Sequence, residues 1–426
     1  MIRIDTVVIG AGHAGLAMSR ALREAGRDHV VLEQGDVGDS WRRARWDSLT
    51  LLTPAWMNQL PGWDSIDDPD EFLTASQFAQ RLGQYAVAVQ ARVLARTRVL
   101  DVRQVDARPY RYRVTAAGCA WLARSVVLAT GPGGRAIVPQ PVADLEPRLD
   151  VVSAAAYRNP AALRPGGVLV IGASASGVQI ADELVRAGRR VLLAAGGHTR
   201  VPRRYRGMDI YFWLKRTGSL DRSIDELPAP HRTRTEPSLQ VVGRRPEHRV
   251  DLAALSERGV EVLGHWIGAD GPRVRFADDL PASCADAERR MRRLLAAIDA
   301  DITGSGLEPE VLGPDAPAPF VPPAARTEVD LRAEGIASVV LATGYRTHLP
   351  WLRVPVLDVA GRVLQRRGVT PAPGLFTVGQ RFQNRRSSGL IAGAQHDVAE
   401  VVAHLTGSGS GSLLTAVAVP GEAGTR

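Results

Sequence analysis

The hydrophobic residues of this chain gather into short, nearly continuous runs separated by glycine-rich turns and helical patterns. Such runs occur at 4–9, 29–33, 125–129, 167–171, 190–194, 338–342 and 375–379. Apolar runs without alternation are typical of strands buried on both faces of a parallel sheet. Helical periodicity marks about 14–25, 74–89, 177–187, 286–302 and 394–405, whereas 93–105 and 110–115 alternate as a β-meander. The pattern predicts an α/β fold.

One order of elements occurs twice: strand, glycine-rich turn, helix, strand, and later a strand ending in Ala-Thr-Gly. The second copy begins at 167, before the last strand and helix of the chain, so it lies inside the first copy. We therefore predict two Rossmann-like dinucleotide-binding domains, the second inserted into the first. The predicted boundaries are 1–150 and 346–406 for the first domain, 151–345 for the second with a Pro-rich insertion, and 407–426 for a disordered tail.

The first glycine-rich turn follows a strand and opens a helix, as a dinucleotide-binding loop requires. Its glycines allow a tight turn, a close approach to the pyrophosphate and close packing of helix on strand. An acid, Glu33, ends the next strand, where a carboxylate can bond ribose hydroxyls. This N-terminal unit suits FAD, and the residues we expect to contact it are Gly10, Ala11, Gly12, His13, Ala14, Gly15, Glu33 and Gln34.

The second turn has the same form, with serines at two positions. Its expected cofactor contacts are Gly172, Ser174, Ala175, Ser176 and Gly177. No acid ends the following strand, and arginines follow it instead, which favours the 2′-phosphate of NADPH over NADH. Arg200, Arg203 and Arg204 are the candidates for that phosphate, Arg200 and Arg203 foremost, although any one of them could equally be a surface charge.

Composition excludes several other classes of protein. Hydrophobic residues make up 45% and charged residues 23%, as in ordinary globular proteins. The formal charge of +8 is dispersed and aromatics are only 5%, so nucleic-acid binding is not expected; the arginines either coat the surface or attract cofactor phosphates. The two cysteines, Cys119 and Cys284, form no Cys-x-x-Cys pair, which argues against thioredoxin reductase-like enzymes.

Membrane, export and metal signals are also missing from the sequence. No apolar run is long enough to span a membrane, and the N-terminus enters a strand pattern without a signal peptide, so we expect a cytoplasmic protein. The histidines are scattered without metal-ligand spacing, so we predict no metal site.

The irregular stretch 41–61, rich in Trp, Leu and Pro, looks like a loop that covers a ligand; we name it the cover segment. Its tryptophans, with Trp63, either line a flavin or substrate pocket or simply pack the loop. The cluster Tyr205, Tyr211, Phe212 and Trp213 forms either an apolar substrate wall or ordinary core.

The stretch from Asp39 to Pro54, together with 376–380 and 385–389, resembles the flavin-dependent monooxygenases with two dinucleotide folds. These are the flavin-containing monooxygenases, the Baeyer–Villiger monooxygenases and a bacterial flavoprotein subgroup. The resemblance covers most of 1–405. It implies that NADPH reduces FAD, that O2 adds at flavin C4a, and that the resulting peroxide oxygenates a substrate. It also implies cofactor contacts at Ser40, Trp41, Gly131, Gly344, Gly379 and Ser388.

The chain departs from these relatives where they carry catalytic motifs. These relatives share a fingerprint motif in a linker, which aligns here with 147–160. Ser153 stands where that motif has histidine, and Tyr157 matches its final aromatic position. The segment Leu52-Thr53-Pro54 matches the Asn-x-Pro segment near the flavin in flavin-containing monooxygenases, but without its asparagine. Asp47 stands where Baeyer–Villiger enzymes have an acid that supports an arginine. The candidate catalytic residues are therefore Asp47, Thr53, Ser153 and Tyr157.

Three functions follow. The leading hypothesis is an NADPH- and O2-dependent monooxygenase acting on a small or medium apolar metabolite, by N- or S-oxygenation or Baeyer–Villiger insertion. The second is a flavin reductase or oxidase without a stable peroxyflavin, and the third is a nucleotide-sensing flavoprotein. The expected partners are the substrate and O2, without nucleic acid or membrane, in a monomer or homodimer.

Overall fold

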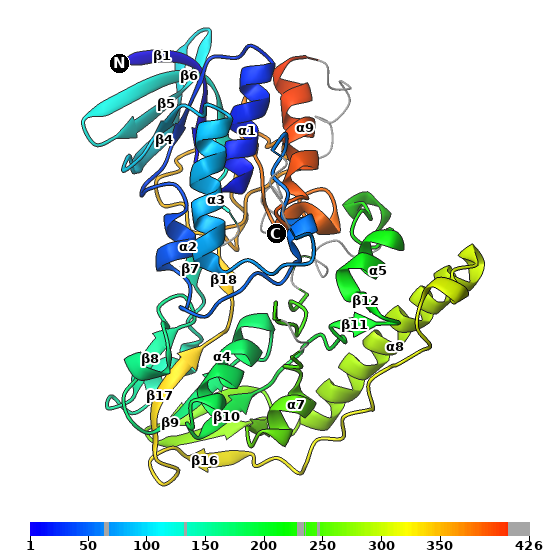
Figure 1. The fold of residues 1–426 in the computed structure, drawn as a ribbon. Helices are drawn as coiled ribbons and strands as arrows, with labels where there is room; N and C mark the ends of the chain where they lie inside the picture. The colour runs from blue at the N-terminus through cyan, green and yellow to red at the C-terminus, as the bar shows by residue number, and fades with distance from the viewer. Residues whose placement is uncertain (64–67, 132–133, 228–233, 235, 245–247, 408–426) are drawn as a thin grey trace, which may run out of the picture.

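The computed structural model describes residues 1–63, 68–131, 134–227, 234, 236–244 and 248–407. The predicted disordered tail, 407–426, therefore lies outside the described residues except for its first position. Figure 1 shows two sheet-and-helix units, with β1, β6, α1 and α9 in the upper one and β9, β10, β17 and α4 in the lower one. Two nucleotide-binding folds in one chain confirm the predicted fold class.

The first sheet has the strand order β3-β2-β1-β6-β5-β4, and β19 pairs with β6. Its strands are β1 (Ile2–Ile9), β2 (His29–Leu32), β3 (Val93–Leu94), β4 (Val99–Ala107), β5 (Tyr110–Ala116), β6 (Cys119–Leu128) and β19 (Leu375–Thr377). Strand β1 pairs in parallel with both β2 and β6, and β19 pairs in parallel with β6. The last strand of the chain therefore completes the first sheet.

Strand β6 begins earlier than the apolar run predicted. Its first half alternates in burial and pairs antiparallel with β5, whereas its second half is buried throughout. From Trp121 to Leu128 the strand also pairs in parallel with β1. One strand thus belongs to both the meander and the parallel sheet, and only its doubly covered half shows the continuous apolar signature.

The second sheet is wholly parallel, with the order β13-β10-β9-β17-β8. Its strands are β8 (Asp150–Ser153), β9 (Gly167–Ile171), β10 (Val191–Ala194), β13 (Glu261–Leu263) and β17 (Ile336–Leu341). Because β19 returns to the first sheet after β17, the second domain is inserted into the first, as predicted.

The helices are α1 (His13–Glu24), α2 (Asp39–Arg43), α3 (Ala75–Ala88), α4 (Ala175–Arg186), α5 (Ile210–Arg216), α7 (Leu252–Glu257), α8 (Leu280–Ser305) and α9 (Ala394–Leu405). A capping box of Thr74 and Gln77 begins α3. Helix α8 starts six residues before the predicted start of 286, with Asp279 as its N-cap. The helices α1 and α9 pack side by side over the first sheet (Figure 1).

The remaining strands are short. They are β7 (Arg135–Ala136), β11 (Arg204–Tyr205), β12 (Met208–Asp209), β14 (Trp266–Asp270), β15 (Arg273–Phe276), β16 (Glu328–Asp330) and β18 (Tyr345–Arg346). The antiparallel β14-β15-β16 sheet was not predicted, because its strands lie in a polar, Pro-rich region without a long apolar run.

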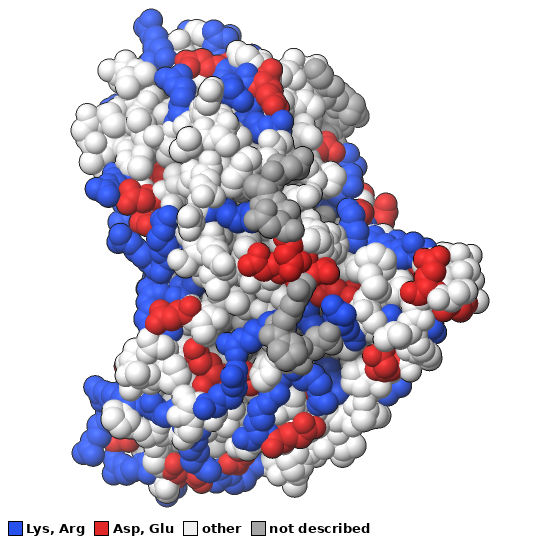
Figure 2. All heavy atoms as spheres, viewed as in Figure 1, with Lys and Arg blue, Asp and Glu red and all other residues white. Residues whose placement is uncertain are grey.

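Basic and acidic side chains are interleaved on the face shown in Figure 2, so the excess positive charge is spread out there. In the described ranges, no helix is both long and apolar enough to cross a membrane.

Candidate functional site

The first glycine loop joins β1 to α1 and presses against the end of β6. Gly10 has φ +105°, and a Cβ there would lie 2.5 Å from the carbonyl oxygen of Ala129. A Cβ on Gly15 would lie 1.9 Å from the carbonyl oxygen of Gly10. Both positions therefore exclude any larger residue for reasons internal to the fold.

Gly12 is different, because the protein itself does not require glycine there. Its backbone is extended, with φ −74° and ψ −178°. A Cβ at this position would meet nothing within 4 Å. Gly12 is also the N-cap of α1 and no side chain caps the helix, so its first N–H groups stay available. This open cradle at a helix N-terminus fits the pyrophosphate of FAD.

Glu33 ends β2 next to this loop. Its carboxylate accepts hydrogen bonds from the backbone N–H groups of Ala11 (2.7 Å) and Gly35 (3.0 Å). The acid thus braces the loop and remains half-buried at the strand end where a ribose would lie. His13 has a buried Nε2 without a partner among the described residues, and burial lowers its pKa to about 4. The ring is therefore neutral at physiological pH. Gln34 and Ser40 are exposed nearby.

The second glycine loop repeats this geometry between β9 and α4. Gly172 has φ +106°, and a Cβ there would lie 2.6 Å from the carbonyl oxygen of Ala342. A Cβ on Gly177 would lie 1.7 Å from the carbonyl oxygen of Gly172. Ser174 is the N-cap of α4, with an extended backbone and no side-chain cap, and Ala175 and Ser176 form the first turn. The residues fit a second dinucleotide.

The two Ala-Thr-Gly segments contact the glycine loops, and these contacts account for their small residues. Each ends the strand whose alanine carbonyl closes on the first glycine of a loop. Beyond them β7 pairs with β18, and the Ile137 N–H donates to the Gly344 carbonyl (3.0 Å). Gly131 and Gly344 both have positive φ, with open space where a Cβ would lie. The two crossings between the domains therefore run side by side.

The cover segment packs against both domains. Trp46 and Leu49 belong to the core around α4, whereas Leu51 and Leu60 belong to the core around α1. Trp41 packs against both cores and meets the Phe78 ring edge-on at 4.9 Å. These contacts support the loop-packing interpretation for Trp41 and Trp46. The segment fastens the two domains together beside the glycine loops.

Asp47 and Tyr157 lie where the cover segment meets the linker after β8. The Asp47 carboxylate accepts from Asn159 Nδ2 (2.6 Å). The Tyr157 hydroxyl donates to Glu183 (2.8 Å), and burial together with Glu183 raises the pKa of Tyr157. No arginine pairs with Asp47 in the described part of the chain.

Thr53 contacts Asn58, a residue that the sequence pattern did not predict for this site. Its hydroxyl donates to Asn58 Oδ1 (2.6 Å), and Asn58 Nδ2 donates back to the Thr53 carbonyl (2.9 Å). Both residues are buried. An asparagine therefore does stand beside Thr53, supplied by the turn after Pro54 rather than by position 52. Asn58 could have been found only by allowing for this turn.

Ser153 ends β8, and its carbonyl accepts from the backbone N–H of Tyr157 (2.9 Å). No side-chain hydrogen bond joins any two of the four predicted catalytic residues in the described ranges.

Arg200 and Arg203, which follow β10, are not surface charges. Arg200 is 5% exposed and Arg203 is 6% exposed. Arg203 donates to the Leu52 carbonyl (2.7 Å), pairs with Asp209, and stacks on Phe72 with 4.4 Å between the guanidinium carbon and the ring centroid. The surface interpretation is therefore wrong for both. Arg203 is committed to the cover segment, which leaves Arg200 as the better candidate for a phosphate.

The C-terminal part of the first domain reaches the first loop. Gly379 follows β19 with φ +73°, and a Cβ there would lie 2.7 Å from the Ala14 side chain. Ser388 is buried, and its hydroxyl accepts from the N–H groups of Asn384 (3.1 Å) and Arg385 (3.0 Å). The same hydroxyl donates to Asp397 (2.9 Å).

Asp397, on the first turn of α9, is fully buried. Its second oxygen, the Asn384 amide and the Ser387 hydroxyl have no hydrogen-bond partner among the described residues. Burial raises the pKa of Asp397 from 3.8 to about 7, against the Ser388 hydrogen bond. The sequence signal was an acid on the apolar face of the last helix. The unpaired atoms of this cluster are suited to hydrogen bonds with polar groups of a cofactor or with water.

The aromatic cluster near 210 is core. Tyr205, Tyr211 and Trp213 are at most 5% exposed and pack against α8, so the core interpretation is correct for these three. In the described ranges no group of His, Cys, Asp or Glu could hold a metal ion.

Comparison with known proteins places this geometry in context. A family model described as pyridine nucleotide-disulphide oxidoreductase matches residues 7–215. An uncharacterized CzcO-like oxidoreductase of Geobacillus kaustophilus is 28% identical, over 92% of this chain and 96% of its own. A flavin-containing monooxygenase from Stenotrophomonas maltophilia has a similar structure, with a TM-score of 0.65 and 20% identity over 96% of this chain and 99% of its own.

OTEMO in complex with FAD and NADP is a further structural neighbour, with a TM-score of 0.54 and 16% identity over 95% of this chain and 85% of its own. The predicted resemblance to flavoproteins with two dinucleotide-binding folds is confirmed, as is the prediction of an oxidoreductase.

Proposed function

We propose that this chain, a flavoprotein oxidoreductase similar to the flavin-containing monooxygenases, is an FAD-dependent, NADPH-consuming monooxygenase. It binds FAD at the first glycine loop and NADPH at the second. It transfers one oxygen atom of O2 to a small or medium apolar metabolite. A cytoplasmic location stays a prediction.

The proposal rests on one observation. The two glycine loops have the same geometry, and each packs against the end of a strand that leads into one of the two paired crossings between the domains. Gly10 abuts Ala129 and Gly172 abuts Ala342 at nearly equal distances. Strand β7 follows β6 in the chain and β18 follows β17, and the two short strands pair with each other, so we infer that both loops flank one junction between the domains. The similar fold of a flavin-containing monooxygenase from S. maltophilia, over nearly the whole chain, supports the proposal.

The chain's own residues bind, orient and shield. The N-terminal N–H groups of α1 and α4, which no side chain caps, would bind the pyrophosphates. The cover segment, with Trp41 between the two cores, excludes water from the junction. Bound FAD would supply the redox chemistry: it takes electrons from NADPH and activates O2.

The decisive experiment is anaerobic reduction by NADPH followed by rapid mixing with O2. We expect a yellow protein that is reduced by NADPH and then passes through a transient spectrum distinct from both oxidised and reduced flavin. Direct return to oxidised flavin with release of hydrogen peroxide would select the reductase or oxidase instead. A colourless protein that takes up no FAD would overturn the proposal.

A further inference from the structure

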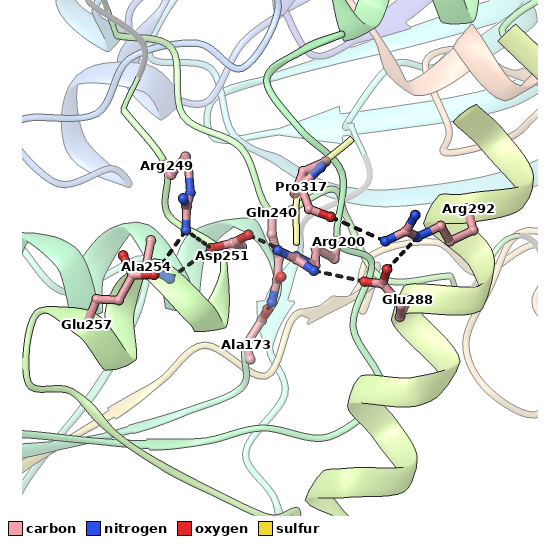
Figure 3. Close-up of polar contacts among 10 residues, drawn as sticks. All are labelled: Ala173, Arg200, Gln240, Arg249, Asp251, Ala254, Glu257, Glu288, Arg292 and Pro317. Atoms are coloured by element: carbon pink, nitrogen blue, oxygen red, sulfur yellow. Dashed lines mark hydrogen bonds and ion pairs between the residues drawn. The ribbon is translucent and has the colours of Figure 1, made fainter. Parts of the chain in front are cut away.

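Arg200 lies just beyond β10, at the strand end where a Rossmann-like domain receives the adenosine ribose. Figure 3 shows its guanidinium held between two helices. Nε donates to Asp251 at the start of α7 (2.9 Å), and Nη1 donates to Glu288 in α8 (2.8 Å). Two carboxylates therefore compete for the cation that a 2′-phosphate would use.

The two carboxylates are anchored differently. The other oxygen of Asp251 accepts from the Ala254 N–H (2.9 Å) and caps α7, so Asp251 is fixed by its helix. The other oxygen of Glu288 accepts from Arg292 (2.7 Å), one turn further along α8. Glu288 can therefore release Arg200 and keep a cationic partner. Asp251 positions Arg200, whereas Glu288 occupies its terminal nitrogen reversibly.

A second buried polar side chain, Gln240, lines the same small cavity as Arg200. Gln240 is 2% exposed, and its Nε2 donates to the carbonyl of Ala173 in the second glycine loop (2.7 Å). Its Oε1 is buried without a hydrogen-bond partner among the described residues. Arg200, Gln240 and Glu288 line one small cavity. An unpaired buried acceptor beside a cation is suited to the free ribose hydroxyl that adjoins a 2′-phosphate.

We propose that Glu288 determines the choice between NADPH and NADH by competing with the 2′-phosphate for Arg200. The inference rests on the proposed function, because it needs a dinucleotide at the second loop. Arginine binds phosphate best with its terminal nitrogens, one of which Glu288 takes. The carboxylate also repels a dianionic phosphate at short range, whereas the 2′-hydroxyl of NADH carries no charge.

The test compares Glu288→Gln with the wild type in the FAD-loaded protein, using NADP+ and NAD+ in calorimetric titrations. Glutamine keeps the size of the side chain but removes its charge and one of its two acceptor oxygens. We expect the affinity for NADP+ to rise at least about five-fold and that for NAD+ to change less than about two-fold. Glu328→Gln, an exposed carboxylate of β16 in the same domain, is the matched control and should change neither.

Unchanged or weaker NADP+ binding by a folded Glu288→Gln protein would overturn the inference while leaving the proposed function intact. Should the glutamine variant fail to fold, Glu288→Ala is tested by the same criterion. A wild type that binds FAD but neither NADP+ nor NAD+ would overturn both proposals.

Discussion

Asp397 is a buried carboxyl group whose protonation changes near neutral pH, so it makes the stability of the fold depend on pH. Its pKa is raised to about 7 in the folded protein, so the native state holds the proton more tightly than the unfolded chain. The protonated group therefore stabilises the fold fully below about pH 4, the ordinary value. This contribution is lost as the pH rises through 7, since the ionised carboxylate must then remain buried.

Asp397→Asn should remove this loss. We expect the variant to exceed the wild type in free energy of unfolding by roughly 1–3 kcal/mol at pH 8, and to match it near pH 4.5. Urea denaturation of the FAD-free protein at the two pH values measures the difference. A difference that does not vary with pH would show that Asp397 acts only through packing.

Gly12 is a position where the fold does not require glycine but the proposed FAD site does. Because a Cβ at this position meets no protein atom within 4 Å, Gly12→Ala should leave the melting temperature of the FAD-free protein unchanged. It should weaken FAD binding by about ten-fold or more, because the methyl group occupies the place of the pyrophosphate. Gly83→Ala, on α3 with equally open surroundings, is the control for FAD titration. Normal FAD affinity in Gly12→Ala would argue against the assigned loop.

At the scale of elements, the cover segment is held to the second domain by Arg203. This side chain spans the Leu52 carbonyl, Asp209 and the Phe72 ring. Asp209 also caps α5 through the Tyr211 N–H (2.8 Å). The arginine thus links a loop of the first domain to a helix of the second.

Arg203→Met should destabilise the protein by about 2–4 kcal/mol, because it leaves the buried Asp209 unpaired. It should leave the preference between NADP+ and NAD+ unchanged, since Arg203 is committed to the cover segment. Denaturation measures the first effect and nucleotide titration the second. A selective loss of NADP+ affinity would return Arg203 to the phosphate site.

At the scale of the whole molecule, the first domain is assembled from both ends of the chain. The strand β19 completes the sheet begun by β1, and Gly379 packs against Ala14 in the first loop. The proposed FAD site therefore depends on segments separated by the entire second domain. The two crossings pair through β7 and β18 and so help to hold these segments in place relative to one another.

FAD should therefore stabilise the protein as a whole. At a free concentration of one hundred times its Kd, we expect FAD to add about 2.7 kcal/mol to the free energy of unfolding, provided that it binds the native state alone. Thermal denaturation at increasing FAD concentrations measures the shift in melting temperature. A melting temperature that ignores FAD would contradict a site built from both chain ends.

The sequence by itself determined the two nucleotide loops, the parallel strands and the order of insertion. These features are local or periodic: a glycine forced by a positive φ, or an apolar run forced by burial on two faces, leaves its mark within a few residues. It therefore predicted the tight turns at Gly10 and Gly172, which the structure has with positive φ.

Only the tertiary structure decided what the polar side chains do. Arg200 and Arg203 look alike in the sequence, yet one faces Asp251 and Glu288 while the other holds the cover segment. Asn58 meets Thr53 because a turn intervenes, and Asp397 is buried because α9 packs on α1. Charge pairing and burial depend on which distant segments meet, and no local pattern encodes that.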